Sequence, residues 1–326
     1  MRRNRLGRTG LEISEIAFGG GVTGGILLKA DETTRVTVLM RAVSAGINWI
    51  DTAALYGNGA SEEVIGRHLE ALTPRPYVST KVRIEHDDRK DLRGAIERSL
   101  ERSLTRLRCD RVTLFQLHNQ LGEPVGDRPS LSADDVLGPG GVADTFDRLK
   151  EQGLFHASGV TAAGDTQACL EVLHSGRFDC AQVYYNAINP SAAWARAPRT
   201  WMAQDFSGII AACWRQEMGV LAIRIWAGGP LASPKRPERL AVLTSGTDVD
   251  NEMRCAAAVH KALGNGYGTA AQAALRFVLN NRHLSTRVIG IATLHDLNEA
   301  LIATAQGALP STAIAKLEAL WPTDFR

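Results

Sequence analysis

The chain has 326 residues, of which 44% are hydrophobic and 22% are charged, and its formal net charge at pH 7 is +2. This composition is typical of a globular protein, and a charge so close to zero favours neither nucleic acid nor a membrane surface as a partner. The length fits either two ordinary domains or one large barrel, and composition alone does not choose between them.

No apolar run approaches the ~20 residues that a membrane-spanning helix needs. The basic residues at positions 1–5 are not followed by the apolar segment of a signal peptide. The five cysteines are odd in number and lack CxxC spacing, so they indicate neither a disulfide framework nor a zinc site. We therefore expect a cytoplasmic protein with reduced thiols and no bound metal.

The chain begins with a predicted β-hairpin over residues 3–15. Ile16-Ala17-Phe18 then begins a first strand, and glycines that include Gly20 end this strand where bulk would obstruct a ligand. The first helix is expected from about Asp31 to Ala45.

The stretch 45–66 carries the first functional signal. A short buried strand, Ile47–Ile50, is followed by Asp51, and Tyr56 lies in the glycine-bounded loop beyond it. Ser61 is expected to cap a helix over 61–71. An ionisable residue at the carboxyl end of a strand is typical of a barrel active site, although such an Asp can also form a turn and such a Tyr can simply pack.

Two later strands repeat the pattern. The strand 77–81 ends at Lys81, and the strand 112–117 is followed by His118. Three successive strands thus each deliver one ionisable residue at the carboxyl end. The irregular segment 119–141 comes next, and we expect it to cover the substrate as a loop that contributes little to the core.

Strands and helices continue to alternate up to the C-terminus. Eight such units without a break in composition predict the α/β class, as a single (β/α)8 TIM barrel domain over residues 1–326 with the N-terminal hairpin and an extra C-terminal helix. The other expected helices cover 91–108, 142–152, 166–174, 203–217, 250–263, 269–281, 294–305 and 311–321, and the other strands 155–160, 181–184, 220–225 and 287–291.

An acid, a phenol, an amine and an imidazole at these positions resemble the catalytic tetrad of the aldo-keto reductase superfamily: Asp51, Tyr56, Lys81 and His118. The resemblance also covers the opening Leu6-Gly7-Arg8-Thr9-Gly10-Leu11 and the segment 46–53, and it extends from about residue 3 to about residue 305. It implies that Tyr56 donates a proton to a carbonyl oxygen, as general acids do. Lys81 and Asp51 would then support the phenolate, and neutral His118 would orient the carbonyl.

Hydride transfer requires a cofactor, because none of these side chains carries hydride. The superfamily uses NAD(P)(H), with NADP(H) as the default and NAD(H) as an alternative. The resemblance assigns cofactor contacts to eight residues, namely Gly20, Thr161, Gln182, Gly228, Gly229, Gly290, Asp296 and Glu299.

The chain departs from the superfamily at two of these places. Ala162 stands beside Thr161 where an Asn is usual, and it cannot donate a hydrogen bond. Asp296 stands where NADP-dependent relatives carry a basic residue, and an unpaired carboxylate there would favour a ribose hydroxyl over a phosphate. Arg287 or His295 could supply the missing positive charge.

The resemblance predicts the NAD(P)-dependent reduction of a small aldehyde, ketone or sugar, with no nucleic-acid or membrane partner and an open oligomeric state. Three alternatives remain. The protein could be an NAD-dependent aldose 1-dehydrogenase, a weakly active redox-sensing subunit like the potassium-channel β-subunits, or an aldolase that uses Lys81 as a Schiff base.

Overall fold

Eight parallel strands close into a barrel in the computed structural model, which describes residues 1–326 except for 125–126, 237–241 and 243. Around the barrel the order is β3-β4-β5-β6-β9-β10-β11-β12, and β12 pairs with β3 to close it. The predicted (β/α)8 barrel is therefore confirmed. The barrel strands are β3 (Ile16–Gly19), β4 (Trp49–Asp51), β5 (Tyr77–Val82), β6 (Val112–Leu117), β9 (Phe155–Ala162), β10 (Cys180–Tyr184), β11 (Gly219–Ile223) and β12 (Thr286–Gly290).

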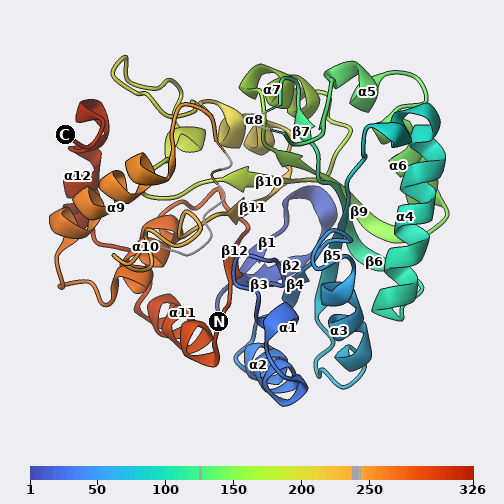
Figure 1. Ribbon diagram of the computed structural model, residues 1–326, viewed down its shortest axis with the longest axis horizontal. Coiled ribbons are helices and arrows are strands. Elements are labelled where there is room, and N and C mark those ends of the chain that lie inside the picture. The colour runs from blue at the N-terminus through green and yellow to red at the C-terminus, as the bar shows by residue number, and fades with distance from the viewer. Residues whose placement is uncertain (125–126, 237–241, 243) are drawn as a thin grey trace.

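Helices surround these strands, and their colours pass around the ring from blue to red in chain order (Figure 1). The α-helices are α1 (Ile26–Lys29), α2 (Glu32–Ser44), α3 (Ala60–His68), α4 (Leu92–Leu107), α5 (Ala133–Leu137), α6 (Val142–Glu151), α7 (Thr166–His174), α8 (Ile209–Arg215), α9 (Val249–Leu263), α10 (Ala270–Leu279), α11 (Leu294–Gln306) and α12 (Ser311–Glu318). The described residues also form four short 3-10 helices, η1 (Gly7–Thr9), η2 (Asp87–Asp91), η3 (Ser191–Ala193) and η4 (Trp321–Thr323). Among the described helices, none is long and apolar enough to cross a membrane.

Two helix starts differ from the sequence prediction. Gly59, with φ of 92°, is the N-cap of α3, whereas Ser61 lies buried inside the helix and its hydroxyl donates to the Gly20 carbonyl. A glycine reaches this left-handed conformation without the steric penalty that a serine would meet. α8 begins only at Ile209, because Gly208 has φ of 88° and the preceding residues form a turn.

The predicted N-terminal hairpin is confirmed: β1 (Arg3–Arg5) pairs antiparallel with β2 (Glu12–Ser14). Its Leu6 and Ile13 are fully buried among side chains inside the barrel, including Trp49 and Leu221. The hairpin therefore closes one end of the barrel with apolar side chains, as burial of apolar area favours.

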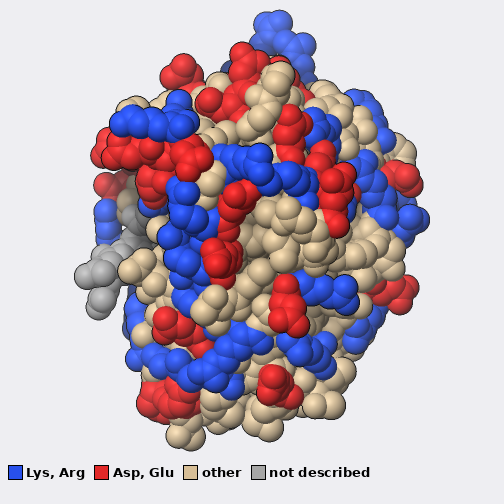
Figure 2. Space-filling view, turned by 90° about the vertical axis from the view of Figure 1, so that its right-hand side faces the viewer, with Lys and Arg blue, Asp and Glu red and all other residues tan. Residues whose placement is uncertain are grey.

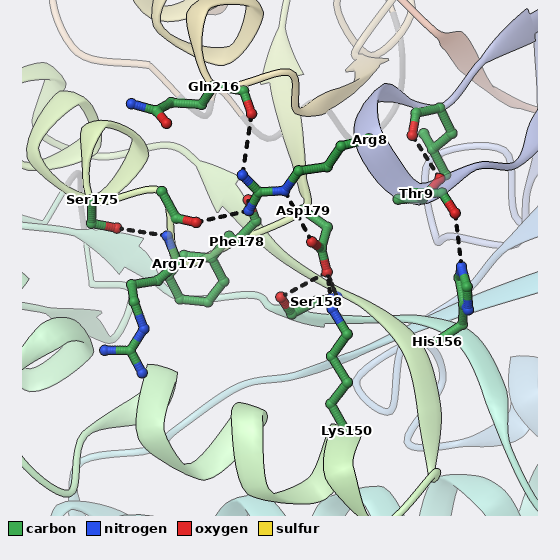
Figure 3. Close-up of polar contacts among 12 residues, drawn as sticks. Arg8, Thr9, Lys150, His156, Ser158, Ser175, Arg177, Phe178, Asp179 and Gln216 are labelled. Carbon is green, nitrogen blue, oxygen red and sulfur yellow. Dashed lines mark hydrogen bonds and ion pairs between the residues drawn. The ribbon is translucent and has the colours of Figure 1, made fainter.

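Polar contacts fasten the hairpin to the barrel (Figure 3). The Arg8 guanidinium donates to the Asp179 carboxylate at 3.3 Å and to the carbonyls of Gly176 and Phe178. Lys150 donates to the other oxygen of Asp179 at 2.6 Å, so one carboxylate joins the hairpin, α6 and the start of β10.

The segment 119–141 is more ordered than the predicted loop. β7 (Gln120–Leu121) pairs in parallel with β8 (Ser130–Leu131), and Ser132 begins α5 with a reciprocal capping box to Asp135. Leu131 and Val136 are buried in the main apolar core. The expectation that this segment contributes little to the core was therefore wrong, although part of it does line the candidate site.

The face shown in Figure 2 carries basic and acidic side chains close to one another, without a large area of one sign. Seventeen ion pairs join described residues, most of them at least partly exposed, and such surface pairs contribute little to stability.

Candidate active site

Alternation along the strands determines which side chains enter the barrel. Side chains of a strand point to opposite faces in turn. In β4, Trp49 packs inside the barrel against the hairpin, so Asp51 also points inward. The same alternation brings Lys81 from β5 and Gln182 from β10 to the interior of the barrel. They lie nearer the carboxyl ends of the strands than the apolar side chains of the hairpin do. Polar side chains thus occupy the carboxyl end of the barrel.

The Lys81 ammonium lies at the centre of this group and is fully buried. Its Nζ donates to Asp51 Oδ2 at 2.6 Å, to the Thr52 carbonyl at 2.7 Å and to the Tyr56 hydroxyl oxygen at 3.3 Å. An ammonium has three hydrogens, and these three acceptors match them. Burial alone would lower the pKa of Lys81, but the charge of Asp51 and the contacts with Tyr56 outweigh burial and raise it.

The Asp51 carboxylate is held by three side chains, counting Lys81. Ser79 Oγ donates to its Oδ1 at 2.7 Å, and Gln182 Nε2 donates to the same oxygen at 2.8 Å. Ser79 in turn accepts a hydrogen bond from the Trp49 indole at 3.0 Å. The position of the acid is therefore fixed by strands β4, β5 and β10 together.

Tyr56 and His118 lie side by side at the mouth of the barrel. Their rings meet edge to face with centroids 5.7 Å apart. Within the described part of the chain, the Tyr56 hydroxyl accepts from Lys81 and donates to no acceptor. Its proton is thus available to a molecule in the cavity.

His118 is uncharged near neutral pH. Burial, followed by the positive charges of Lys81, Arg83 and Arg128, holds the pKa of its imidazole well below the ordinary value. Its Nδ1 is buried without a partner among the described residues. A neutral imidazole has one N–H donor and one acceptor, so it can donate a hydrogen bond to a carbonyl oxygen.

A cavity of about 880 Å³ begins at these residues and extends across the barrel mouth to α11. This is large for a small-molecule site. Seven of the eight predicted cofactor residues line it, and they are Thr161, Gln182, Gly228, Gly229, Gly290, Asp296 and Glu299. In the described residues no group of three potential metal ligands occurs.

Gly20 is the exception among the predicted cofactor residues. Its neighbours Gly19 and Gly21 line the cavity, but Gly20 is buried behind its wall. A Cβ at Gly20 would lie 2.7 Å from the Ser61 hydroxyl, so this glycine is needed for packing between β3 and α3. At Gly21, by contrast, a Cβ would meet the Tyr56 ring at 3.2 Å.

Two further expectations at the α11 end were wrong. Asp296 is not unpaired, because its Oδ2 accepts from the Ala292 and Thr293 amides as the third residue of a capping box. Arg287 cannot reach the cavity, since its buried guanidinium donates to the carbonyls of Val278, Leu284 and Asn281 on the outside of the barrel. His295 does line the cavity, as proposed from the sequence.

Three arginines in the cavity wall were missed from the sequence: Arg83, Arg128 and Arg224. Arg83 follows β5 two residues after Lys81, on the same side of the strand, so alternation could have identified it. Arg224 follows β11 directly, which is the same kind of position as His118 after β6.

Known proteins resemble the chain over most of its length. A solved structure, aldo-keto reductase AKR11C1 from Bacillus halodurans in its holo form, superposes with a TM-score of 0.72 at 21% identity, covering 98% of this chain and 96% of that one. L-galactose dehydrogenase of Arabidopsis thaliana is 25% identical over 308 residues, 92% of this chain and 87% of that protein.

A third similarity is more limited. The uncharacterized oxidoreductase YqkF of Bacillus subtilis is 28% identical over 168 residues, so the match spans about half of each protein, 50% of this chain and 49% of YqkF. The model of the aldo/keto reductase family, however, matches residues 15–322. The chain therefore belongs to the aldo/keto reductase family of oxidoreductases.

Proposed function

We propose that the protein is an NAD(P)-dependent oxidoreductase that reduces the carbonyl of a small aldehyde, ketone or sugar to an alcohol. The observation that carries this proposal is the Lys81 ammonium, whose three hydrogens are bound by Asp51, Thr52 and Tyr56. Because Tyr56 accepts from Lys81, its own proton is directed elsewhere and can pass to a carbonyl oxygen in the cavity.

The residues at the barrel mouth suit a nicotinamide dinucleotide. The Thr161 hydroxyl is buried without a described partner, and Gly228 and Gly229 line the cavity without side chains that would obstruct a dinucleotide. The cavity also reaches the N-terminal ends of α10 and α11, where positive helix dipoles favour phosphate. When bound, such a cofactor supplies the hydride for the carbonyl carbon.

The chain's own residues supply the proton and the orientation. Tyr56 gives its proton to the carbonyl oxygen, and Lys81 stabilises the phenolate that remains. Asp51 holds Lys81 in its charged form, and Gln182 and Ser79 hold Asp51. His118 orients the same carbonyl oxygen through a neutral N–H donor.

Tyr56→Phe tests the proposal. It removes the proton donor while keeping the ring against His118 and Gly21. We expect kcat for carbonyl reduction to fall by roughly 10²–10⁴-fold, with little change in the Kd of the dinucleotide. Turnover should be followed by absorbance of NADH and NADPH on a panel of aldehydes, ketones and aldoses. Comparable kcat in the Phe variant would overturn the role given to Tyr56.

The second candidate is oxidation of a sugar with NAD. It is favoured by the acidic residues Asp296 and Glu299 at the α11 end of the cavity, where the described lining includes no Lys or Arg. L-galactose dehydrogenase, with its long match to this chain, is named for oxidation of a sugar. In that direction the Tyr56 phenolate would accept the alcohol proton. Measurement of both directions at pH 7 with both cofactors separates the two candidates.

A further inference from the structure

The arginines Arg83, Arg128 and Arg224 come from three separate parts of the chain and line the same cavity. Arg83 follows β5, Arg128 lies between β7 and β8, and Arg224 follows β11. The proton transfer proposed above uses none of them. Their convergence therefore requires a separate explanation.

The three guanidinium groups are close enough to affect ionisation around them. Burial, and then the charges of Arg224 and Arg83, lower the pKa of Arg128. Arg83 and Arg128 also contribute, after burial and Lys81, to the lowered pKa of His118. Positive charge is thus concentrated on the His118 side of the cavity.

This charge is poorly compensated within the described part of the chain. The guanidinium groups of Arg128 and Arg224 form no ion pair or hydrogen bond there, and that of Arg83 pairs only with the exposed Glu85 at 2.5 Å. Glu252 of α9 attracts Arg224 electrostatically but forms no ion pair with it, and burial raises the pKa of Glu252 to about 7.

The acidic residues that line the cavity are already engaged. Asp51 is paired with Lys81, Asp296 caps α11, and Glu299 accepts from Thr269 and Gln272. Partly buried cations without partners are unfavourable, and an anion among them would relieve this. Planar guanidinium groups bind carboxylate or phosphate through paired hydrogen bonds.

We propose that the substrate is a small carbonyl compound that also carries a carboxylate or phosphate group, and that Arg83, Arg128 and Arg224 bind this anionic group beside His118. The proposal rests on the carbonyl reduction proposed above. Hydride adds to the carbonyl carbon, the Tyr56 proton adds to the oxygen, and the anionic group is unchanged by the reaction.

The rival explanation is that Arg224 binds the pyrophosphate of the dinucleotide. Arg224 precedes Gly228 by four residues, so it belongs to the same connection as the glycine loop. Arg83 and Arg128, in contrast, help to lower the pKa of His118, beside which the carbonyl would lie. Substrate and cofactor binding must therefore be measured separately for each arginine.

The first experiment compares matched aldehydes that differ in one group. Butanal is paired with 4-oxobutanoate for the carboxylate, and glyceraldehyde with glyceraldehyde 3-phosphate for the phosphate. We expect kcat/KM to be at least about tenfold higher for one anionic member than for its neutral partner, which corresponds to ~1.4 kcal/mol. The advantage should shrink between 50 and 500 mM NaCl, because salt screens partly exposed charges. Equal kcat/KM within both pairs would overturn the proposal.

The second experiment uses the variants Arg83→Gln and Arg128→Gln, with Arg102→Gln as the control. Arg102 is exposed on α4, away from the cavity lining. Each cavity variant should lower the anionic-to-neutral ratio of kcat/KM by about tenfold, mainly through KM, with dinucleotide Kd unchanged. The control should keep the wild-type ratio. Ratios that stay at the wild-type value in both cavity variants would contradict the proposal.

The variant Arg224→Met tests whether Arg224 binds the substrate's anionic group or the pyrophosphate of the cofactor. Loss of the anionic preference with unchanged dinucleotide Kd supports its place in the substrate site. A raised dinucleotide Kd with an unchanged preference assigns Arg224 to the pyrophosphate and overturns its part in the proposal.

The experiments distinguish failure of the anion-site proposal from failure of the carbonyl-reduction proposal. If the protein reduces neutral aldehydes in a Tyr56-dependent way but shows no preference for anionic ones, the anion site is overturned and carbonyl reduction is supported. If no carbonyl is turned over, calorimetry with butanoate and inorganic phosphate on the NADP+-loaded protein decides the anion site directly. Binding that is lost in Arg83→Gln and Arg128→Gln supports the site, and no binding to the wild type overturns it.

Discussion

Lys81 carries its charge without any contact with water, and the surrounding acceptors explain how. The desolvation of a buried ammonium is expensive unless charge and hydrogen bonds offset it. Here Asp51 supplies the opposite charge, and Thr52 and Tyr56 supply the remaining acceptors. The same contacts that keep Lys81 charged also orient the Tyr56 hydroxyl, so the stability of this site and the proposed proton transfer depend on the same three bonds.

Lys81→Met should be as damaging to turnover as removal of the Tyr56 hydroxyl, because the phenolate loses its stabilising charge. It should also lower thermal stability, since the Asp51 carboxylate would stay buried with only Ser79 and Gln182 as donors. Breaking one side of a buried ion pair typically costs about 3–5 kcal/mol. Steady-state kinetics and the thermal midpoint of unfolding check both effects.

Asp51→Asn changes the other member of the Lys81–Asp51 ion pair. It should reduce kcat less than Lys81→Met, because the geometry around Tyr56 survives. Combined with Lys81→Met, it should restore part of the lost stability, since no uncompensated charge remains, but restore none of the activity. If the Lys81→Met protein were nearly as active as wild type at neutral pH, the electrostatic role of Lys81 would be wrong.

At the level of elements, the N-terminal hairpin is held by one carboxylate. Burial raises the pKa of Asp179, but hydrogen bonds from Lys150 and from the Ser158 amide, together with Arg8, outweigh burial and keep the pKa below its ordinary value. A depressed carboxyl pKa means that the folded state favours the ionised form. Asp179 therefore stabilises the fold when ionised.

Asp179→Asn should lower the free energy of unfolding by about 1–3 kcal/mol, because Lys150 and Arg8 lose a charged acceptor. The contribution of the carboxylate is complete above its unfolded-state pKa, about 3.9, and is lost as pH falls through its lower folded-state pKa. The difference in thermal midpoint between wild type and variant should thus be large at pH 7 and shrink toward pH 3. Asp144→Asn, which breaks an exposed pair with Arg177, should have an effect below about 1 kcal/mol.

The β7–β8–α5 segment is an element of the core as well as part of the cavity wall. Leu131 is 1% exposed and packs in the main apolar core. Leu131→Ala should cost about 2–5 kcal/mol, as large-to-small core substitutions do. Ile302→Ala, at a residue that is 47% exposed on α11, should change stability by less than about 0.5 kcal/mol. A neutral Leu131→Ala in thermal or denaturant unfolding would restore the view of this segment as a simple covering loop.

For the whole molecule, local signals predicted the barrel and the positions of Asp51, Tyr56, Lys81 and His118. Buried strands, helix periodicity and an ionisable residue after a strand are all visible within a few residues of sequence. One error concerned the start of α3. The cap was predicted from the side chain of Ser61, but the left-handed backbone conformation of Gly59 makes this glycine the N-cap.

Other errors depended on distant parts of the chain. The apolar partners of Leu131 and the outward direction of Arg287 are set by packing between elements far apart in sequence. The engagement of Asp296 is different, because Thr293 and Asp296 form a local T-x-x-D pattern that indicates a capping box. This capping role is therefore predictable from four consecutive residues.

In the proposed mode of binding, the preference between NAD and NADP depends on the α11 end of the cavity, away from Tyr56 and His118. The described lining there has Asp296 and Glu299 but no Lys or Arg, so a 2′-phosphate would meet acidic side chains. We therefore expect dual use with a modest preference for NAD. Asp296→Arg alone is a poor test of this preference, because it also removes the capping carboxylate of α11. The loss of such a cap typically costs ~1 kcal/mol of stability.

Ala292→Arg tests the cofactor preference without removing the capping carboxylate. Ala292 is exposed, lines the cavity and contributes only its backbone amide to the cap, so a new guanidinium there adds a phosphate-binding group and leaves the capping box in place. We expect the ratio of Kd values to shift toward NADP by at least about tenfold, which asks ~1.4 kcal/mol of the new contact, with an unchanged thermal midpoint.

Asp296→Arg should shift the ratio in the same direction but lower the midpoint. The shift should weaken at higher salt, since the new contact is an ion pair near solvent. Kd ratios that stay the same in both variants would mean that the start of α11 does not face the ribose, and the dinucleotide would then have to lie elsewhere in the cavity.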